Sequence, residues 1–145
     1  MPAETLKLTG QLRLQHDELT ALAQELESEL GAARLVSGEG LCRERLGKLL
    51  AKLNVHLALE DKILYQQLLA HERKDVVLLA RRFIDEVGSL GGQVKEFAAR
   101  WEAARSIQER PTAFVAERRT ILAALTQRAR REDEELYALA DELGL

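Results

Sequence analysis

Cysteine and proline are almost absent from the sequence. Its 145 residues include one cysteine, Cys42, and two prolines. A single cysteine excludes a disulfide within the chain and is typical of a reducing compartment. The scarcity of proline leaves long stretches able to form uninterrupted helices. No apolar run of the sequence approaches the roughly 20 residues that span a bilayer. We therefore expect a cytoplasmic protein with no membrane partner.

Signals for several functional classes are also missing. The 21 Lys and Arg residues nearly balance the 24 Asp and Glu residues, and the net charge of −3 argues against a nucleic-acid partner. Residues 1–5 contain neither the basic nor the apolar region of a signal peptide. The sequence has no nucleophile with a neighbouring base, no glycine-rich phosphate loop and no Cys-x-x-Cys pair. We therefore do not expect an enzyme.

Leucine and alanine dominate what is present. Hydrophobic residues make up 46% of the chain and aromatic residues 4%, a mixture that favours an all-α fold. Apolar residues recur every three or four positions along four stretches, which predicts four amphipathic helices. The predicted helices cover about residues 5–33, 41–71, 76–105 and 113–143, with loops at 31–40, 71–75 and 106–112. Because the connections are short, we expect residues 1–145 to form a single up-down-up-down four-helix bundle domain.

Three glycines, Gly88, Gly91 and Gly92, interrupt the third predicted helix. Each glycine in a helix interior costs up to about 1 kcal/mol relative to alanine, so their presence needs a reason. Two reasons are open from the sequence. The glycines mark either a kink in the helix or a place where another helix packs closely against it.

The second predicted helix carries a histidine and a carboxylate within its apolar stripe. The stripe runs through Leu46, Leu49 and Leu53 and then meets His56 and Glu60. A spacing of four residues places the imidazole and the carboxylate on one face of the helix. A carboxylate in a core is costly unless it is paired, protonated or bound to a metal. This pair is therefore the first candidate for a functional site.

The same pattern recurs in the fourth predicted helix. Glu-Asp-x-x-Leu-Tyr occupies residues 60–65 and again residues 132–137. The second copy has Arg128 at the position that corresponds to His56 in the first copy. The chain thus contains an approximate internal repeat. Each copy begins with a glutamate, and the two glutamates are 72 residues apart.

Polar residues in the stripes of the other helices extend this site. His16 lies in the stripe of the first predicted helix, and Glu86 lies near the equivalent depth in the third. Helical bundles build metal sites from imidazoles and carboxylates that converge from facing helices. Two imidazoles and two carboxylates suit iron, zinc or manganese. The candidate metal ligands are His16, His56, Glu60 and Glu132, with the role of Glu86 left open.

These motifs resemble those of the hemerythrin-like family, the HHE cation-binding domains. The resemblance is carried by Gln-His-Asp-Glu-Leu at residues 15–19, by residues 56–65 and by residues 131–137. The likeness in helix order extends over essentially the whole chain. It implies a helical bundle around a non-haem di-iron centre that binds oxygen or serves in sensing and iron handling. It also implies that His16, His56, Glu60 and Glu132 occupy ligand positions.

The chain departs from the pattern of that family at two ligand positions. The third helix lacks the family's one or two histidines, and Glu86, Val87 or Gly88 takes their place. Arg128 stands where the family has a histidine four residues before the last carboxylate. We therefore predict a degenerate site that binds one non-haem iron ion or none, in a protein with a sensing or regulatory role.

Arg128 suggests an alternative without a metal. A guanidinium carries a fixed positive charge and could offset the carboxylates of Glu60 and Glu132 as an ion would. His16 would then be a hydrogen-bonded core histidine. Residues 59–64 also resemble, faintly, a segment of the regulator of sigma D family, helical bundles that bind sigma factors. This alternative predicts a metal-free interaction protein with a regulatory protein partner. The sequence leaves open whether the chain is a monomer or a homodimer.

Overall fold

The computed structural model describes residues 7–28 and 32–145, and describes side chains in these ranges except at 28, 32–43, 87, 88 and 104. All regular secondary structure in the described ranges is helical, which confirms the predicted all-α fold. The elements are α1 (Leu8–Ser28), α2 (Ala32–Leu59), η1 (Glu60–Leu64), α3 (Tyr65–Leu69), α4 (Lys74–Arg100), α5 (Ala104–Glu109), α6 (Pro111–Arg131), η2 (Glu132–Leu136) and α7 (Tyr137–Glu142).

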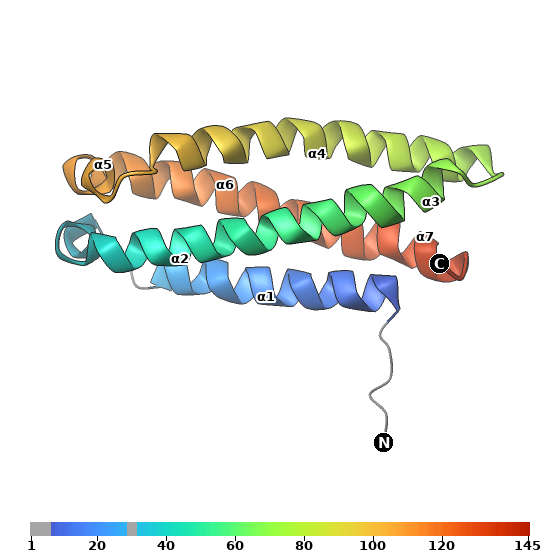
Figure 1. The fold of residues 1–145 in the computed structure, drawn as a ribbon, viewed down its shortest axis with the longest axis horizontal. Helices are drawn as coiled ribbons and strands as arrows, with labels where there is room; N and C mark the ends of the chain where they lie inside the picture. The colour runs from blue at the N-terminus through green and yellow to red at the C-terminus, as the bar shows by residue number, and fades with distance from the viewer. Residues whose placement is uncertain (1–6, 29–31) are drawn as a thin grey trace, which may run out of the picture.

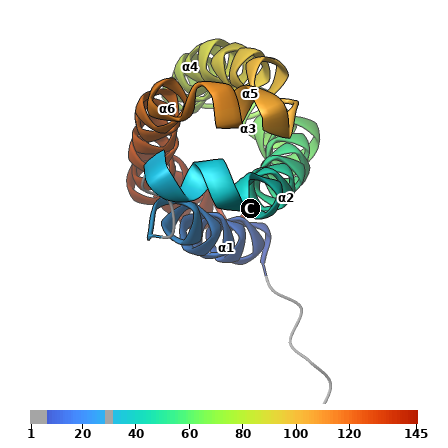
Figure 2. The same cartoon turned by 90° about the vertical axis from the view of Figure 1, so that its left-hand side faces the viewer.

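The elements form four long rods that lie side by side along the longest axis of the molecule (Figure 1). One rod is α1, the second runs continuously from α2 through η1 to α3, the third is α4, and the fourth runs from α6 through η2 to α7. Successive rods point in opposite directions, and seen from one end they surround a common centre (Figure 2). This is the predicted up-down-up-down bundle. Within the described ranges, no helix is long and apolar enough to cross a membrane.

The apolar stripes of the rods meet in two core clusters. One cluster lies towards α5, and the other lies towards the opposite end, around α3 and α7. Full burial of a leucine or phenylalanine side chain contributes about 1.5–3 kcal/mol, so each cluster is a major source of stability. The first consists of Leu26, Leu46, Leu49, Phe97, Trp101, Ile107, Phe114 and Leu122. The second consists of Leu12, Leu64, Tyr65, Leu68, Val76, Ala80, Phe83, Leu136, Tyr137 and Ala140.

Two of the predicted loops are wrong. The helix α2 begins at Ala32, inside the stretch 31–40 that its glycines and serine mark as a loop. Intrinsic helix propensity predicts a helix only weakly, because contacts with the rest of the structure can outweigh it. The helix α4 ends at Arg100 instead of 105, and the short helix α5 fills much of the predicted loop 106–112. Ile107 anchors α5, because its side chain is fully buried in the first core cluster. The predicted start of the first helix, at residue 5, lies outside the described residues.

Both copies of the sequence repeat form a π-helical turn. The turns η1 and η2 begin at Glu60 and Glu132, and each ends with a hydrogen bond from a tyrosine N–H to the carbonyl of the glutamate five residues earlier. This bond stacks residues five apart, so that Tyr65 and Tyr137 lie on the same side of their rods as the glutamates. All four side chains are buried. Single π-helical turns within α-helices are frequent at functional sites.

Substitution of Gly91 or Gly92 by alanine is expected to raise the free energy of unfolding by about 0.5–1 kcal/mol each. A Cβ atom at either position would meet nothing within 4 Å, so close helix packing does not require these two glycines. Denaturant unfolding of each variant measures the effect. The control is Gly144→Ala, which should destabilise the chain because Gly144 has a φ of 73° that alanine adopts poorly. A loss of stability in both α4 variants would contradict the prediction.

Candidate metal centre

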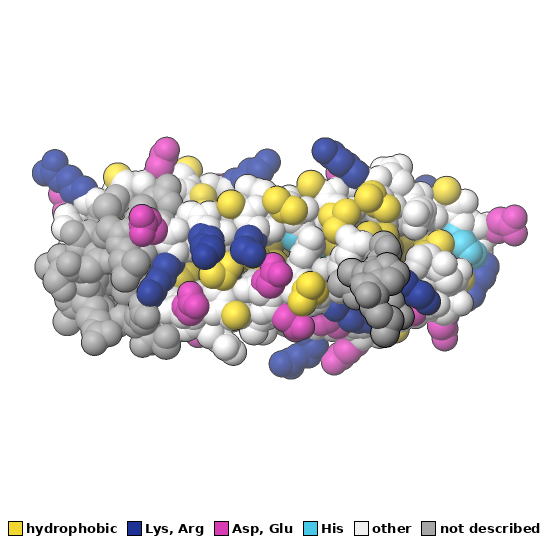
Figure 3. Space-filling view, turned by 60° about the horizontal axis from the view of Figure 1, so that its bottom comes forward, with side chains coloured by type: hydrophobic (Ala, Val, Ile, Leu, Met, Phe, Trp, Pro, Cys, Tyr) yellow, Lys and Arg dark blue, Asp and Glu magenta, His cyan; other side chains and the backbone are white. Residues whose placement is uncertain are grey.

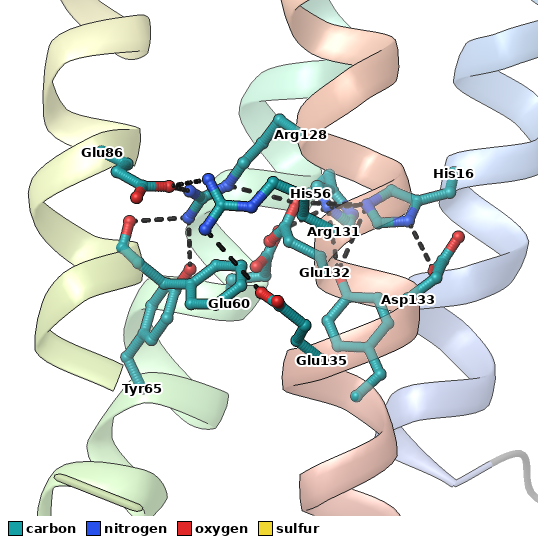
Figure 4. A network of polar contacts seen from close by, with 12 residues as sticks. His16, His56, Glu60, Tyr65, Glu86, Arg128, Arg131, Glu132, Asp133 and Glu135 are labelled. Carbon is teal, nitrogen blue, oxygen red and sulfur yellow. Dashed lines mark hydrogen bonds and ion pairs between the residues drawn. The ribbon is translucent and has the colours of Figure 1, made fainter. Parts of the chain in front are cut away.

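The four predicted ligand residues come together between the two core clusters (Figure 4). His16 projects from α1, His56 from the last turn of α2, and Glu60 and Glu132 from the first residues of η1 and η2. One donor atom from each side chain lies within 4.8 Å of the other three. All four side chains are buried, with 1–5% of their surface exposed. We refer to these four residues as the His–Glu cluster.

The Nε2 atoms of the two histidines face each other and the carboxylates. They lie 3.0 Å apart. The Nε2 atom of His56 is 2.5 Å from Oε1 of Glu60, and that of His16 is 3.5 Å from Oε1 of Glu132. Four donor atoms from three rods of the bundle thus converge on one small volume.

The opposite nitrogen of each imidazole is held by a side chain outside the cluster. The Nδ1 atom of His16 lies 2.9 Å from Oδ1 of Asp133, and that of His56 lies 2.7 Å from Oε1 of Gln15. A carboxylate oxygen and an amide oxygen only accept hydrogen bonds, so both Nδ1 atoms donate. In the neutral rings this leaves a lone pair on each Nε2, aimed into the cluster. Metal-binding histidines typically have such a partner behind the ring.

Burial and mutual contact shift the pKa values of the cluster in different directions. Burial, followed by the neighbouring His16, lowers the pKa of His56 to about 4. Burial, followed by the neighbouring Glu60, raises the pKa of Glu132 to about 8. Burial also opposes the charged form of His16, but Glu132 and Asp133 outweigh it and raise the pKa of His16. Without a metal, Glu132 and His16 therefore retain protons that they would lose in water, whereas His56 loses its proton more readily.

Apart from a proton that the two glutamates share, three carboxylate oxygens of the cluster receive no hydrogen bond from the described part of the chain. They are both oxygens of Glu60 and Oε2 of Glu132. The short contact of Glu60 with His56 lacks the geometry of a hydrogen bond. A buried acceptor without a donor costs about 1–3 kcal/mol, and more when it is charged. A metal ion removes this cost, and two imidazoles with two carboxylates suit iron, zinc or manganese. The residues present therefore fit a metal ion.

Glu86, whose role the sequence left open, is not in the His–Glu cluster. Its Oε2 atom accepts a hydrogen bond of 2.8 Å from Nη1 of Arg128 and a second from Nη1 of Arg131. The side chain of Arg128 also donates to the carbonyl of Phe83 at 2.6 Å and to Oη of Tyr65 at 3.3 Å. The guanidinium lies over the ring of Phe83, 4.4 Å from its centroid. Glu86 is thus an ion-pair partner of two arginines.

The predicted contact between Arg128 and the cluster is present but long. Nε of Arg128 lies 3.8 Å from Oε1 of Glu132 and makes no hydrogen bond. The shorter ion pair of the guanidinium is with Glu86. Arg128 therefore flanks the His–Glu cluster as a fixed cation and leaves the three carboxylate oxygens without a donor.

A cavity of about 60 Å³ adjoins the cluster on the side of the first core cluster. It is less than half the size of an apolar cavity of about 150 Å³ that binds benzene. A molecule of the size of benzene is therefore too large for it. Its apolar walls include Leu19, Leu49, Leu53, Leu90, Val94, Leu122 and Leu125, and its polar end is formed by His16, His56, Arg128 and Glu132.

Asp133→Asn is expected to weaken metal binding about 10–100-fold, the usual effect of removing a partner behind a metal-binding histidine. The amide is neutral and supports the imidazole of His16 less strongly than the carboxylate does. A competition titration with a chromogenic chelator measures the affinity. Glu134→Gln is the matched control, because Glu134 is an exposed acidic neighbour on the same turn. Equal losses in the two variants would contradict a specific role of Asp133.

A family model described as the hemerythrin HHE cation binding domain matches residues 7–140. No curated protein matches the chain, and no solved structure does. The matched segment includes residues of every rod of the bundle and all four residues of the His–Glu cluster. The chain therefore belongs to the hemerythrin family of HHE cation-binding domains.

Proposed function

We propose that this protein binds one iron ion in the His–Glu cluster and that occupancy of the site is the signal it conveys. The observation that carries the proposal is the set of three buried carboxylate oxygens without a hydrogen bond, facing two imidazole lone pairs. Such an arrangement is costly unless a proton or a cation lies between the two glutamates, and the proton costs Glu132 its charge. Iron is the ion that the family resemblance implies, and the donor set accepts it.

The site supports one ion in place of the family's pair. The four donor atoms lie within 4.8 Å of one another, close to the separation of about 4.4 Å between opposite ligands of one ion. The guanidinium of Arg128 occupies the adjoining volume, with Nε 3.8 Å from Oε1 of Glu132. A second divalent ion beside this fixed positive charge would be repelled.

The position of the cluster explains how occupancy could be sensed. An ion would connect α1, the rod of α2 and η1, and the rod of α6 and η2. Without an ion these rods meet there through buried imidazoles and carboxylates. A ligand that binds only the folded state stabilises it by about 2.7 kcal/mol when its concentration is 100 times its Kd. The iron concentration would thus set the stability of the middle of the bundle. The proposed role is regulatory binding, with no turnover of a substrate.

Elemental analysis of the protein, purified without a chelator or a histidine tag, tests the proposal. We expect one iron per chain and a higher melting temperature after iron is added to the metal-free protein. The double variant Glu60→Gln/Glu132→Gln should lose the metal. Asp61→Asn/Glu134→Gln is the matched control, since it changes exposed carboxylates in the same two repeats. Two irons per chain would contradict the one-ion site.

A second candidate is a metal-free interaction protein. It is favoured by the network around Arg128, which supplies a positive charge beside the cluster without any ion. Apolar side chains also gather on one half of the face shown in Figure 3, among charges of both signs. Among the side chains that the structure describes, the large apolar ones that are exposed are Leu14, Val55, Ile63 and Leu78. A chain without metal, and without a thermal shift on adding iron or zinc, would support this candidate.

A further inference from the structure

We propose that Tyr137 is a fifth protein ligand of the ion in the His–Glu cluster and binds it through its phenol oxygen. The inference rests on the proposed one-ion site. Tyr137 is the first residue of α7 and its side chain is fully buried. The π-helical turn η2 stacks it on the side of Glu132, because its N–H bonds to the carbonyl of that residue.

The distances around the phenol oxygen are those between neighbouring ligands of one ion. Oη of Tyr137 lies 3.3 Å from Nε2 of His16 and 3.4 Å from Nε2 of His56, and the two nitrogens lie 3.0 Å apart. A five-coordinate ion with metal–ligand bonds of about 2.0–2.1 Å separates neighbouring ligand atoms by about 2.9–3.6 Å, for angles of 90° to 120°. The three atoms therefore already form one face of a coordination polyhedron.

The hydrogen bonds of Tyr137 lead to the same conclusion. Among the described residues, the polar partners of its hydroxyl are the Nε2 atoms of His16 and His56. An ion that binds both nitrogens removes both acceptors. The fully buried hydroxyl would then lack a partner, at a cost of about 1–3 kcal/mol, unless its oxygen binds the ion as well.

The corresponding tyrosine of the first repeat has a different role. Oη of Tyr65 lies 3.3 Å from Nη2 of Arg128, which donates a hydrogen bond to it. Tyr65 is therefore the partner of the fixed cation, whereas Tyr137 contacts the two imidazoles. The two repeats thus provide a pair of buried tyrosines of which only one is placed to bind an ion.

The chemistry of the proposed bond favours a trivalent ion. The O–H bond of Tyr137 breaks, the oxygen binds the ion, and the proton passes to solvent, as is usual when metals bind protonatable ligands. No oxidation state changes in this step. A phenolate and two carboxylates carry three negative charges, which neutralise ferric iron in a buried site, where net charge is costly. The same donor set would leave one excess negative charge around a divalent ion.

Visible absorption of the ferric protein tests the assignment. The probe is ferric iron supplied as its citrate complex, with excess removed by desalting and bound iron counted by elemental analysis. A phenolate bound to ferric iron gives a charge-transfer band in the visible region. We expect this band in the wild-type protein and in Tyr65→Phe, and its complete loss in Tyr137→Phe at an equal iron content. Resonance Raman excitation within the band should enhance tyrosine ring modes.

The outcomes separate this inference from the proposed function. Two outcomes would overturn the assignment of Tyr137 and leave the proposed function standing. In one, the wild-type chain binds one iron without a visible band; in the other, the Tyr137→Phe variant keeps the band. Loss of the band in Tyr65→Phe at full iron content would overturn it too. A wild-type chain that binds no iron would overturn both proposals. Each phenylalanine variant removes one oxygen atom, and thermal unfolding of the metal-free proteins verifies that both are folded.

Discussion

Arg128→Ala is expected to lower the free energy of unfolding of the metal-free protein by about 3–5 kcal/mol, the usual cost of removing one partner of a buried charge network. The guanidinium is 8% exposed. It donates to Glu86, to Tyr65 and to the carbonyl of Phe83. The substitution removes these bonds together and enlarges the cavity that Arg128 lines. Denaturant unfolding in the presence of a chelator measures the loss.

Two further substitutions identify the cause of this loss. Arg128→Met keeps most of the side-chain volume and removes the charge and its hydrogen bonds, so it isolates the electrostatic part. Arg130→Ala removes an exposed arginine two residues away and should change stability by no more than about 0.5 kcal/mol. An unchanged melting temperature of Arg128→Ala would refute the view that this residue stabilises the metal-free bundle.

The periodicity of the sequence predicted the fold well because apolar spacing determines which face of each helix is buried. Its errors lie where spacing carries little information. Nothing in a local pattern shows that Ile107 is fully buried and holds a short helix across one end of the bundle. The glycines of the stretch 31–40 lower helix propensity, yet α2 already begins at Ala32. Propensity and pattern do not include the contacts made by the rest of the chain.

The sequence also predicted which four residues converge, because buried polar residues recur at one depth of the bundle. It did not assign Gln15 and Asp133 as the side chains that orient the imidazoles. Their positions offered one signal, since each is adjacent in sequence to a residue of the cluster. The π-helical turns were beyond prediction, because an i→i+5 bond leaves the sequence pattern of an α-helix nearly unchanged.

The metal-free protein is expected to lose stability as the pH rises from 6.5 to 8, whereas stabilisation by a metal grows over the same range. The pKa of Glu132 is about 8 in the folded chain, against an ordinary 4.5, because of burial and then Glu60. Above pH 4.5 the unfolded chain releases this proton while the folded chain retains it. Stability from this group is therefore full below pH 4.5 and is lost as the pH rises towards 8.

The two histidines determine the pH range in which the loss of stability can be measured. Burial, and then His16, lowers the pKa of His56 to about 4, so His56 contributes stability above pH 6.5 that is lost as the pH falls towards 4. Between pH 4.5 and 6.5 this trend opposes that of Glu132, and stability changes little. Above pH 6.5 His56 no longer contributes to the slope. The raised pKa of His16 adds to the loss of stability with rising pH, because above pH 6.5 the unfolded chain releases a proton that the folded chain retains.

A fall of about 2 kcal/mol is therefore expected between pH 6.5 and 8, at about 1.36 kcal/mol for each pH unit and each proton. Denaturant unfolding in a chelating buffer at several pH values measures it. Glu132→Gln cannot ionise and should flatten most of the slope, while the exposed Glu134→Gln should retain it. A pH-independent stability of the metal-free wild-type chain would contradict the shifted pKa of Glu132.

Metal binding reverses the trend, since an ion competes with the protons that the cluster holds. Its ligands must be deprotonated, so affinity rises with pH. The rise in melting temperature caused by iron should therefore be larger at pH 8 than at pH 6.5, while the metal-free baseline moves down. This opposition follows from one feature of the chain: two buried glutamates that need either a proton or a cation between them. If iron stabilised the chain equally at both pH values, the ion would be binding at a site other than the His–Glu cluster.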